Sequence, residues 1–575
     1  MPFFLSLSVF LLASPLLAEE PGSLTFSPSA RKQVIDGFGT CLSKELGQQD
    51  WFQRLYYDDL RCSMLRVDLV PRFVSPYSDF TYNSPWFHGK PSLPGPDGNN
   101  VRTYSDAADY TREFAGRRAR IAVMGPDIDQ NLKLLDFDER ALKATGTMAQ
   151  LGQSKSAELG GFKLIGSLWS PAPWLKLASG NTYSKGKHPF PKEGAAFPFI
   201  WFDNFGGGLL DVSDKPLEIF NDGTGPTSSL TQFARCLAAY LRGYQNAFGV
   251  KFYAVSIQNE PFLELFYNSC LYREGTAYAK ALKAARAELV RYPDLKDIKF
   301  FGPEQCIGNE STFLWYFQPK GEKLRRDMLL KMLADIEADP AAAKALDIYA
   351  IHGYASDGIS TTGLGLSKVW PWVRHGWTTA PNPSVPAPVK GFQDYGKRCW
   401  MTETSGEGTA WQDPSNGFPS KGAFGIVLKI MQALDQGEQN AWLYWQLADG
   451  DTVNEGTLTG KTEGANSAKY VAAKHFFRDI RPGAVMLETR VAAPLDACVA
   501  LHEKDRTLTL VVANSSSDNQ SLRIALPPEM KSIRQFQQHT SSNGALWKES
   551  TLAVDNGAAQ ITLPGYSVTT LASGY

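Results

Sequence analysis

Two glutamates follow short apolar segments in this sequence, and together they have the chemistry that breaks a glycosidic bond. Glu260 follows FYAVSIQN and precedes Pro261, whose missing N–H helps to end a strand. Glu403 follows RCWMT and precedes Thr404 and a further hydroxyl residue, which can keep a carboxylate ionised. Glycoside hydrolysis uses one carboxyl group that protonates the leaving oxygen and one ionised carboxylate that attacks the anomeric carbon. The two glutamates are therefore a candidate catalytic pair.

Each glutamate alone is more typical of a solvated loop than of an active site. Glu264 is a rival to Glu260, but it lies beyond the proline and no strand holds it. The pair is more informative than either member, because Glu260 ends the fourth of eight expected strands and Glu403 ends the seventh. In a barrel of parallel strands both would face the C-terminal mouth, where substrates bind.

Eight apolar segments alternate with helical patterns between residues 34 and 480, which favours an α/β fold of the (β/α)8 TIM barrel type. The helical segment Ser229–Phe248 is amphipathic, with Ser229 available as its cap. A doubly wound open sheet is the alternative architecture. Further helices are expected at Gly275–Tyr292, Leu324–Glu337 and Gly422–Gln436. The expected strands are Ile35–Thr40, Ser63–Asp68, Lys163–Trp169, Phe252–Gln258, Lys299–Gly302, Leu346–His352, Arg398–Thr402 and Ala441–Gln446.

Residues suited to binding a sugar or to supporting the pair stand near the ends of the expected strands. Each alone is more typical of the core or the rim of a barrel than of a binding site. A cation such as Arg66 near Glu403 would lower the pKa of that carboxyl group, and Tyr354 can donate a hydrogen bond to it. Glu304 either supports Glu260 or has a structural role. The candidate substrate-binding residues are Arg66, Asp68, Trp169, Asn259, His352, Tyr354 and Trp445.

The last part of the chain changes character after the sequence Arg-Pro-Gly at 481–483. Short strand-like runs such as Leu508–Ala513 and Ala559–Leu563 alternate with turn clusters, and no helical pattern is found. We expect a β-sandwich formed by residues 481–575 together with residues 19–33, since Ser23–Val34 can add a strand to it.

The N-terminus and the composition limit the location and the partners of the protein. Residues 1–18 contain a short apolar run that is typical of a signal peptide, so we expect a secreted or periplasmic protein. No later run is long enough to cross a membrane. The formal net charge of -1 offers no basic field to nucleic acid. The 7 cysteines are scattered without a metal-binding pattern, and one or two disulfides are possible.

The sequence resembles glycoside hydrolase family 30, the family of lysosomal glucosylceramidase and of β-1,6-glucanases, β-1,6-galactanases and xylanases. WSPAPWLK and QNEP are the most specific of the matching segments, which run in order along most of the chain. They are IDGFG at Ile35–Gly39, LRV at Leu65–Val67, SLWSPAPWLK at Ser167–Lys176, SIQNEP at Ser256–Pro261, IHGYA at Ile351–Ala355, MTETSG at Met401–Gly406, AWLYW at Ala441–Trp445 and HFFRDIRPGA at His475–Ala484.

The resemblance implies hydrolysis with retained anomeric configuration through a glycosyl-enzyme. Glu403 would be the nucleophile and Glu260 the general acid/base, with carboxyl groups about 5–5.5 Å apart. Asn259 would contact the sugar 2-hydroxyl. The resemblance also implies a carbohydrate substrate, no cofactor and no metal, and we expect a monomer. It places Arg66, His352 and Tyr354 around the nucleophile, and Trp169 and Trp445 at the −1 sugar site.

The departures from the family pattern leave the sugar and the linkage open. Asp68 and Gln446 are not the residues that glucosylceramidase leads us to expect. The connections Val70–Asp138, Lys176–Ser228 and Pro371–Lys397 are long, and all three would lie at the mouth. A β-1,6-glycanase is one reading. The alternatives are an exo-acting β-glycosidase or a transglycosylase of a related barrel family, or a catalytically silent carbohydrate-binding protein.

Overall fold

The computed structural model describes residues 22–74, 77, 121–177, 179, 206–264, 268–306, 328–354, 366–376, 378, 388, 390–416, 418 and 421–575. The predicted signal peptide lies outside these residues, as do large parts of the three long connections. Within the described ranges, no helix is long and apolar enough to cross a membrane.

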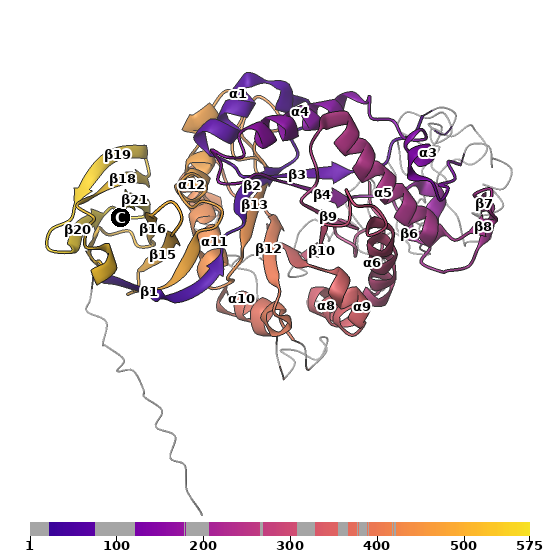
Figure 1. Ribbon diagram of the computed structural model, residues 1–575. Helices are drawn as coiled ribbons and strands as arrows, with labels where there is room; N and C mark the ends of the chain where they lie inside the picture. Colours follow the sequence, from indigo (N-terminus) through magenta and orange to yellow (C-terminus); the bar gives the residue numbers. More distant parts are fainter. Residues whose placement is uncertain are drawn as a thin grey trace, which may run out of the picture.

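Eight parallel strands close into a barrel, which confirms the predicted TIM barrel (Figure 1). The last strand pairs with the first, with Ala441 opposite Gly37, so the alternative of an open sheet is wrong. The strands are, in barrel order, β2 (Gly37–Cys41), β3 (Met64–Leu69), β4 (Lys163–Leu168), β9 (Ala254–Ser256), β10 (Lys299–Cys306), β11 (Ile348–His352), β12 (Arg398–Glu403) and β13 (Ala441–Gln446).

Helices surround the barrel, and the longest of them, α5 (Ser229–Phe248), has the predicted bounds. Its cap is Ser228, whose hydroxyl accepts a hydrogen bond from the N–H of Thr231 at 3.1 Å. The expectation of Ser229 as cap is wrong, because that residue is already helical and its hydroxyl donates to Asp211. The other α-helices among the described residues are α1 (Asp50–Gln53), α3 (Ile128–Leu132), α4 (Arg140–Ser154), α6 (Gly275–Leu289), α8 (Met328–Glu337), α9 (Pro340–Ala345), α10 (Leu366–His375), α11 (Phe424–Asp435) and α12 (Ala468–Phe477).

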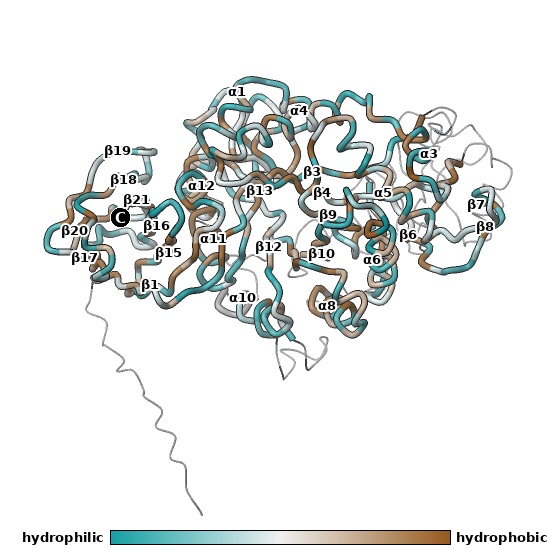
Figure 2. The backbone as a smooth tube through the Cα atoms, viewed as in Figure 1, coloured by the Kyte–Doolittle hydropathy of each residue, from teal (hydrophilic) through white to brown (hydrophobic). Residues whose placement is uncertain are grey.

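The interior of the barrel is apolar in its lower layers and polar at its mouth. Met64 and Trp400 belong to the apolar layers, and Figure 2 shows hydrophobic residues along β3. Since strand side chains alternate between two faces, Arg66 points inward like Met64. Arg66 and His352 are buried at the mouth.

The C-terminal strands form one nine-stranded sheet that encloses its own apolar core, as the predicted β-sandwich requires. The expected extra strand from the N-terminal segment is present and pairs antiparallel with β14 and parallel with β17. In sheet order the strands are β19 (Ala545–Ala553), β18 (Gln535–Ser542), β21 (Ser567–Gly574), β16 (Thr507–Asn514), β15 (Leu495–His502), β14 (Val485–Val491), β1 (Ser23–Val34), β17 (Gln520–Ala525) and β20 (Ala558–Leu563).

Two helices, α11 and α12, lie between the barrel and the nine-stranded sheet (Figure 1). His475 of α12 is buried there, and its two ring nitrogens lie 2.8 Å from the Thr570 hydroxyl and 2.7 Å from the Ser541 hydroxyl. The 7 cysteines are all buried free thiols, so none of the disulfides that the cysteine count allowed is formed.

Candidate active site

Glu260 and Glu403 face each other across the mouth of the barrel. Glu260 follows the fourth barrel strand, β9, and Glu403 is the last residue of the seventh, β12. Their exposed fractions are 8% and 3%. One carboxylate oxygen of each lies within 4.8 Å of the other and of a ring nitrogen of His352. The acids at positions 260 and 403, which are 143 residues apart in the chain, thus form one small cluster.

A break in strand register turns Glu403 toward the barrel interior. Ile351 of β11 lies opposite Met401 of β12, but the next pair is His352 with Glu403, so Thr402 is skipped. Without this bulge, Glu403 would point outward, because Trp400 points inward and strand side chains alternate. Bulges of this kind re-aim side chains next to active sites.

Two donors hold the Glu403 carboxylate. The Arg66 Nη1 donates to Glu403 Oε2 at 2.9 Å, and the Tyr354 hydroxyl donates to Oε1. Burial raises the pKa of Glu403, while His352, Arg66 and the Tyr354 hydrogen bond act in the opposite direction. The prediction that Arg66 lowers the pKa of this carboxyl group is confirmed, but the cost of burying the charge is larger, so the net shift is upward.

Arg66 is the centre of the polar layer at the mouth. Besides Glu403, its guanidinium donates to Glu304 Oε1 at 3.0 Å, to the Ser167 hydroxyl at 3.0 Å and to Asn259 Oδ1 at 2.6 Å. Burial opposes ionisation of Glu304, but the charges of Arg66 and the neighbouring imidazole lower its pKa to about 2. Glu304 is therefore an ionised partner of Arg66. Glu260 and Glu403, the two candidate catalytic acids, have different surroundings.

His352 lies closer to Glu260 than to Glu403. Its Nδ1 is 3.0 Å from Glu260 Oε1, whereas its Nε2 is 3.7 Å from Glu304 and 3.8 Å from Glu403. The resemblance placed His352 around the nucleophile, Glu403. In the structure its direct partner is the other acid, Glu260. Burial lowers the pKa of His352, but the surrounding carboxylates outweigh burial and raise it to about 9.

Three residues of the cluster have left-handed backbone conformations although none is glycine. The φ angles are 45° at Glu260, 58° at Glu304 and 54° at Tyr354. A non-glycine residue in this region costs on the order of 1 kcal/mol, and such conformations gather at functional sites. Backbone strain therefore coincides with the carboxylates and with the tyrosine that contacts Glu403.

The remaining candidates are less buried than the residues of the cluster. Trp169 and Trp445 are half-buried, with ring centroids 5.8 Å apart and planes inclined by 32°. Asp68 lies two residues beyond Arg66 on β3, and its side chain is exposed. The rival acid Glu264 is buried in the loop after β9 and accepts a hydrogen bond from the backbone N–H of Gly208 at 2.8 Å.

Sequence reasoning missed Cys306, which contacts the candidate acid/base directly. It is the last residue of β10, its exposed fraction is 7%, and its thiol lies 3.6 Å from Glu260 Oε1. The expected strand ended at Gly302, because the polar residues and the proline that follow are atypical of a strand interior. Pairing with β11 nevertheless carries the strand on to Cys306.

Sequence reasoning also missed a buried charge network behind the mouth. Lys429 of α11 forms an ion pair with Glu407 and donates to the backbone carbonyls of Tyr354 at 3.2 Å and Ser405 at 3.3 Å. Glu407 also accepts from the Tyr444 hydroxyl at 2.6 Å. The sequence feature that could have revealed this network is Lys429, a lysine inside the apolar helix FGIVLKIMQALD. Lys429 thus connects the segment of Tyr354 with the segment of Ser405, and both segments lie next to Glu403.

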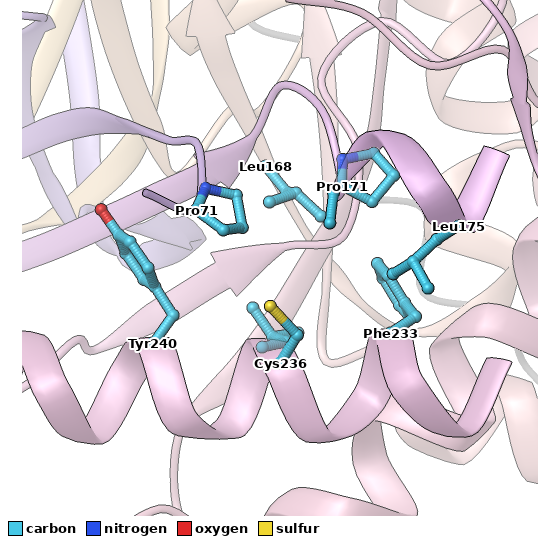
Figure 3. A pocket seen from close by; sticks show the side chains of 9 residues that line it. Pro71, Leu168, Pro171, Leu175, Phe233, Cys236 and Tyr240 are labelled. Atoms are coloured by element: carbon cyan, nitrogen blue, oxygen red, sulfur yellow. The ribbon is translucent and has the colours of Figure 1, made fainter. Parts of the chain in front are cut away.

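A small cavity lies away from the carboxylates, between α5 and the loop after β4 (Figure 3). Its volume of about 10 Å³ is near that of one water molecule. The lining is apolar apart from the Tyr240 hydroxyl and the Cys236 thiol, and it contains no acid. The cavity is thus a packing gap, and the polar cluster at the mouth remains the candidate active site.

Comparisons of the sequence and of the structure give different results. No protein-family model and no curated protein match the sequence. The structure is similar to a glycoside hydrolase family 30 subfamily 8 xylanase from Clostridium acetobutylicum, with a TM-score of 0.59 and 17% identity over 96% of this chain and 100% of that one. The chain has the fold of family 30.

Two further solved structures share this fold. One is an endo-β-1,6-glucanase, with a TM-score of 0.54 and 14% identity over 97% of this chain and 96% of that one. The other is a conserved exported protein from Bacteroides fragilis, with a TM-score of 0.58 and 12% identity over 96% of this chain and 100% of that one. Because the shared architecture extends over nearly the whole chain, it includes both the barrel and the sandwich.

Proposed function

We propose that this protein is a retaining β-glycoside hydrolase of the family 30 type, with Glu403 as nucleophile and Glu260 as general acid/base. The observation that carries the proposal is the approach of the two carboxylates to within 4.8 Å. Retaining enzymes hold their carboxyl groups about 5–5.5 Å apart, and inverting enzymes about 6.5–9.5 Å apart to admit a water molecule. The short separation favours direct attack by one carboxylate.

The surroundings of the two acids support the assignment of roles. Glu403 accepts from Arg66 and Tyr354, which stabilise a carboxylate ready to attack the anomeric carbon. In the first step its oxygen bonds to that carbon while Glu260 gives a proton to the departing oxygen. In the second step Glu260 takes a proton from water, whose oxygen displaces Glu403 and releases the sugar with its original configuration.

The proposed substrate is a β-linked oligo- or polysaccharide. Trp169 and Trp445 offer ring faces on which sugar C–H groups can pack, and Asn259, held by Arg66, can contact a sugar hydroxyl. The similarity to an endo-β-1,6-glucanase favours β-1,6-glycans, and the similarity to a xylanase makes xylans the second class to test. The N-terminal apolar run supports export of the protein, and we propose that it works as a monomer.

We predict that Glu403→Gln lowers turnover by several orders of magnitude without unfolding the protein, because an amide cannot form the glycosyl-enzyme. The measurement is a hydrolysis screen with aryl β-glucoside, β-galactoside, β-xyloside and β-fucoside, β-1,6-glucan, β-1,6-galactan and glucuronoxylan. Glu455→Gln, at an exposed glutamate beyond β13, is the matched control and should keep the wild-type rate. A Glu403→Gln enzyme with a near-normal rate would sink the assignment.

Adding azide to reactions with an activated aryl glycoside distinguishes the nucleophile from the general acid/base. In Glu260→Ala, azide should attack the glycosyl-enzyme, displace Glu403 and give the glycosyl azide with the β configuration. In Glu403→Ala, azide should attack the substrate itself and give the α product. Proton NMR distinguishes the two anomers. The opposite pattern would exchange the roles, and a wild-type product of inverted configuration would rule out the retaining mechanism.

A further inference from the structure

Side chains from two neighbouring strand ends meet at a single oxygen of the candidate acid/base. Glu260 Oε1 lies 3.0 Å from His352 Nδ1 and 3.6 Å from Cys306 Sγ. Cys306 ends β10, His352 ends β11, and the two residues lie opposite each other in the parallel pairing of these strands. Glycoside hydrolysis has no step that needs a thiol. The contact between Cys306 and Glu260 therefore calls for an explanation of its own.

A register shift in β10 turns Cys306 toward the barrel interior. The pairing with β11 advances by only one residue between Pro303 and Gln305, so Glu304 is skipped. Phe301 belongs to the apolar layers of the interior, and without the shift Cys306 would point outward, because strand side chains alternate. Glu304, the skipped residue, has the left-handed φ of 58°. The fold thus uses the same device for Cys306 as for the candidate nucleophile.

Both side chains that contact this oxygen are hydrogen-bond donors. Burial and the charges of Glu260 and Glu403 raise the pKa of Cys306 well above its ordinary value, so the thiol keeps its proton. Burial lowers the pKa of His352, but the surrounding carboxylates outweigh burial and raise it to about 9, so Nδ1 also carries a proton. An S–H group and an N–H group are therefore directed at the same oxygen.

The two donors decide which oxygen of Glu260 can hold a proton. A neutral carboxyl group has one hydroxyl oxygen, which donates, and one carbonyl oxygen, which only accepts. A hydroxyl hydrogen on Oε1 would face the hydrogens of Cys306 and His352, so Oε1 is the carbonyl oxygen. Oε2 accepts no hydrogen bond from the described residues. The proton of the neutral acid therefore belongs on Oε2, the oxygen that is left for the substrate.

We infer that Cys306 is a positioning residue for the general acid/base: together with His352 it holds Oε1 of Glu260, so that Oε2 transfers the proton in both steps. This role rests on the proposed function. In the first step Oε2 gives its proton to the departing oxygen, which keeps the electron pair of the broken glycosidic bond. In the second step Oε2 takes a proton from the water whose oxygen displaces Glu403. The S–H bond of Cys306 stays intact in both steps.

The test compares two substrates whose leaving groups differ in their need for a proton. The β-linked glycan identified by the hydrolysis screen needs the proton of Glu260, whereas dinitrophenolate departs without one. In Cys306→Ala, kcat/KM on the glycan should fall roughly tenfold, a part of the about 10²–10⁴-fold that general acid–base catalysis contributes. On the dinitrophenyl glycoside of the same sugar, the variant should keep kcat/KM within about twofold of the wild type.

Two further variants separate the hydrogen bond from the space that the thiol fills. Cys306→Ser keeps a donor, so it should retain more of the glycan rate than Cys306→Ala. Cys498→Ala is the matched control, because Cys498 is a buried thiol of β15 that donates to the backbone carbonyl of Met431 at 3.7 Å. It should match the wild type on both substrates. Circular dichroism checks that all three variants fold.

A crystal structure of Glu403→Gln with a bound oligosaccharide tests the choice of oxygen. The glycosidic oxygen should lie within hydrogen-bond distance of the Glu260 oxygen that faces away from Cys306. A hydrogen bond to the oxygen on the Cys306 side would overturn the inference.

Three kinetic results would also overturn it: equal losses on both substrates in Cys306→Ala, no loss on either, or equal losses in Cys306→Ala and Cys306→Ser. In an enzyme whose wild type is active, these results reject only the role of Cys306. A wild type that cleaves neither substrate would reject the proposed function and, with it, this role.

Discussion

At the scale of single residues, the mouth of the barrel balances buried charges of both signs. Arg66 and His352 supply positive charge to Glu304 and Glu403, and all four residues are no more than 3% exposed. Buried charges are tolerated when they are paired, and removing one partner is expensive. The pH dependence of stability should therefore report on this cluster.

We predict that His352 stabilises the fold below neutral pH and loses this effect as the solution becomes alkaline. Its folded pKa of about 9 lies above the ordinary 6.5, so the folded state holds the extra proton between these values. The contribution is complete below pH about 6.5, disappears as pH rises through 9, and amounts to about 3 kcal/mol.

The measurement is urea unfolding of wild type and His352→Gln from pH 5 to pH 10. The stability difference between the two proteins should shrink as pH rises across the window from 6.5 to 9. His375→Gln, at an exposed histidine that ends α10, is the control and should show no such trend. A pH-independent difference would mean that the pKa of His352 is the same in the folded and in the unfolded protein.

At the scale of elements, helix α11 positions the residues around Glu403 from behind. Lys429 on this helix donates to the carbonyl of Tyr354, whose φ of 54° brings its hydroxyl to Glu403. It also donates to the carbonyl of Ser405, just after the candidate nucleophile. One side chain thus fixes the two segments that meet at this carboxylate.

We predict that Lys429→Met lowers kcat by about 10²-fold with little change in KM, because a misplacement of about 1 Å at reacting groups has this effect. The variant should also lose stability, since Glu407 keeps a buried charge without its main partner. Steady-state kinetics and thermal unfolding measure the two effects separately.

Adding Glu407→Gln to Lys429→Met separates positioning from charge pairing. The double variant should regain part of the lost stability, because the uncompensated Glu407 carboxylate is gone while Lys469 loses its charge partner. It should not regain kcat. If kcat recovers together with stability, Lys429 serves only as the charge partner of Glu407.

The elements were largely predictable, and their ends were not. Runs of apolar residues identified all eight barrel strands, because a parallel strand is buried on both faces. The fourth strand stops at Ser256, earlier than expected, while the fifth continues past Gly302 to Cys306. Strand ends depend on hydrogen bonds to neighbouring strands, which a local pattern does not contain.

At the scale of the whole molecule, the sandwich is joined to the barrel by buried polar contacts. Both ring nitrogens of His475 form hydrogen bonds with hydroxyl groups, one on β18 and one on β21. The Thr570 hydroxyl also donates to the backbone carbonyl of His475 at 2.9 Å. Burial lowers the pKa of His475 well below its ordinary value. Through these contacts the sandwich can buttress the barrel.

We predict that His475→Leu destabilises the protein by about 2–4 kcal/mol, because two buried hydroxyls lose their partner. The wild type should also lose stability as pH falls below about 6.5, since the unfolded chain takes up a proton there that the folded chain refuses. The variant should lack this acid-side contribution. Thermal unfolding between pH 4 and pH 8 tests both points, with kcat of the folded variant expected to stay at the wild-type value.

The sequence by itself determined the barrel, the sandwich and the pair of glutamates, because these depend on patterns along one segment at a time. The tertiary structure decided the rest of the site. The register shift between β11 and β12, which skips Thr402, turns Glu403 inward. The extension of β10 brings Cys306 to Glu260. Such contacts follow from the register between strands that lie far apart in the chain, and shifting a strand by one residue exchanges its two faces.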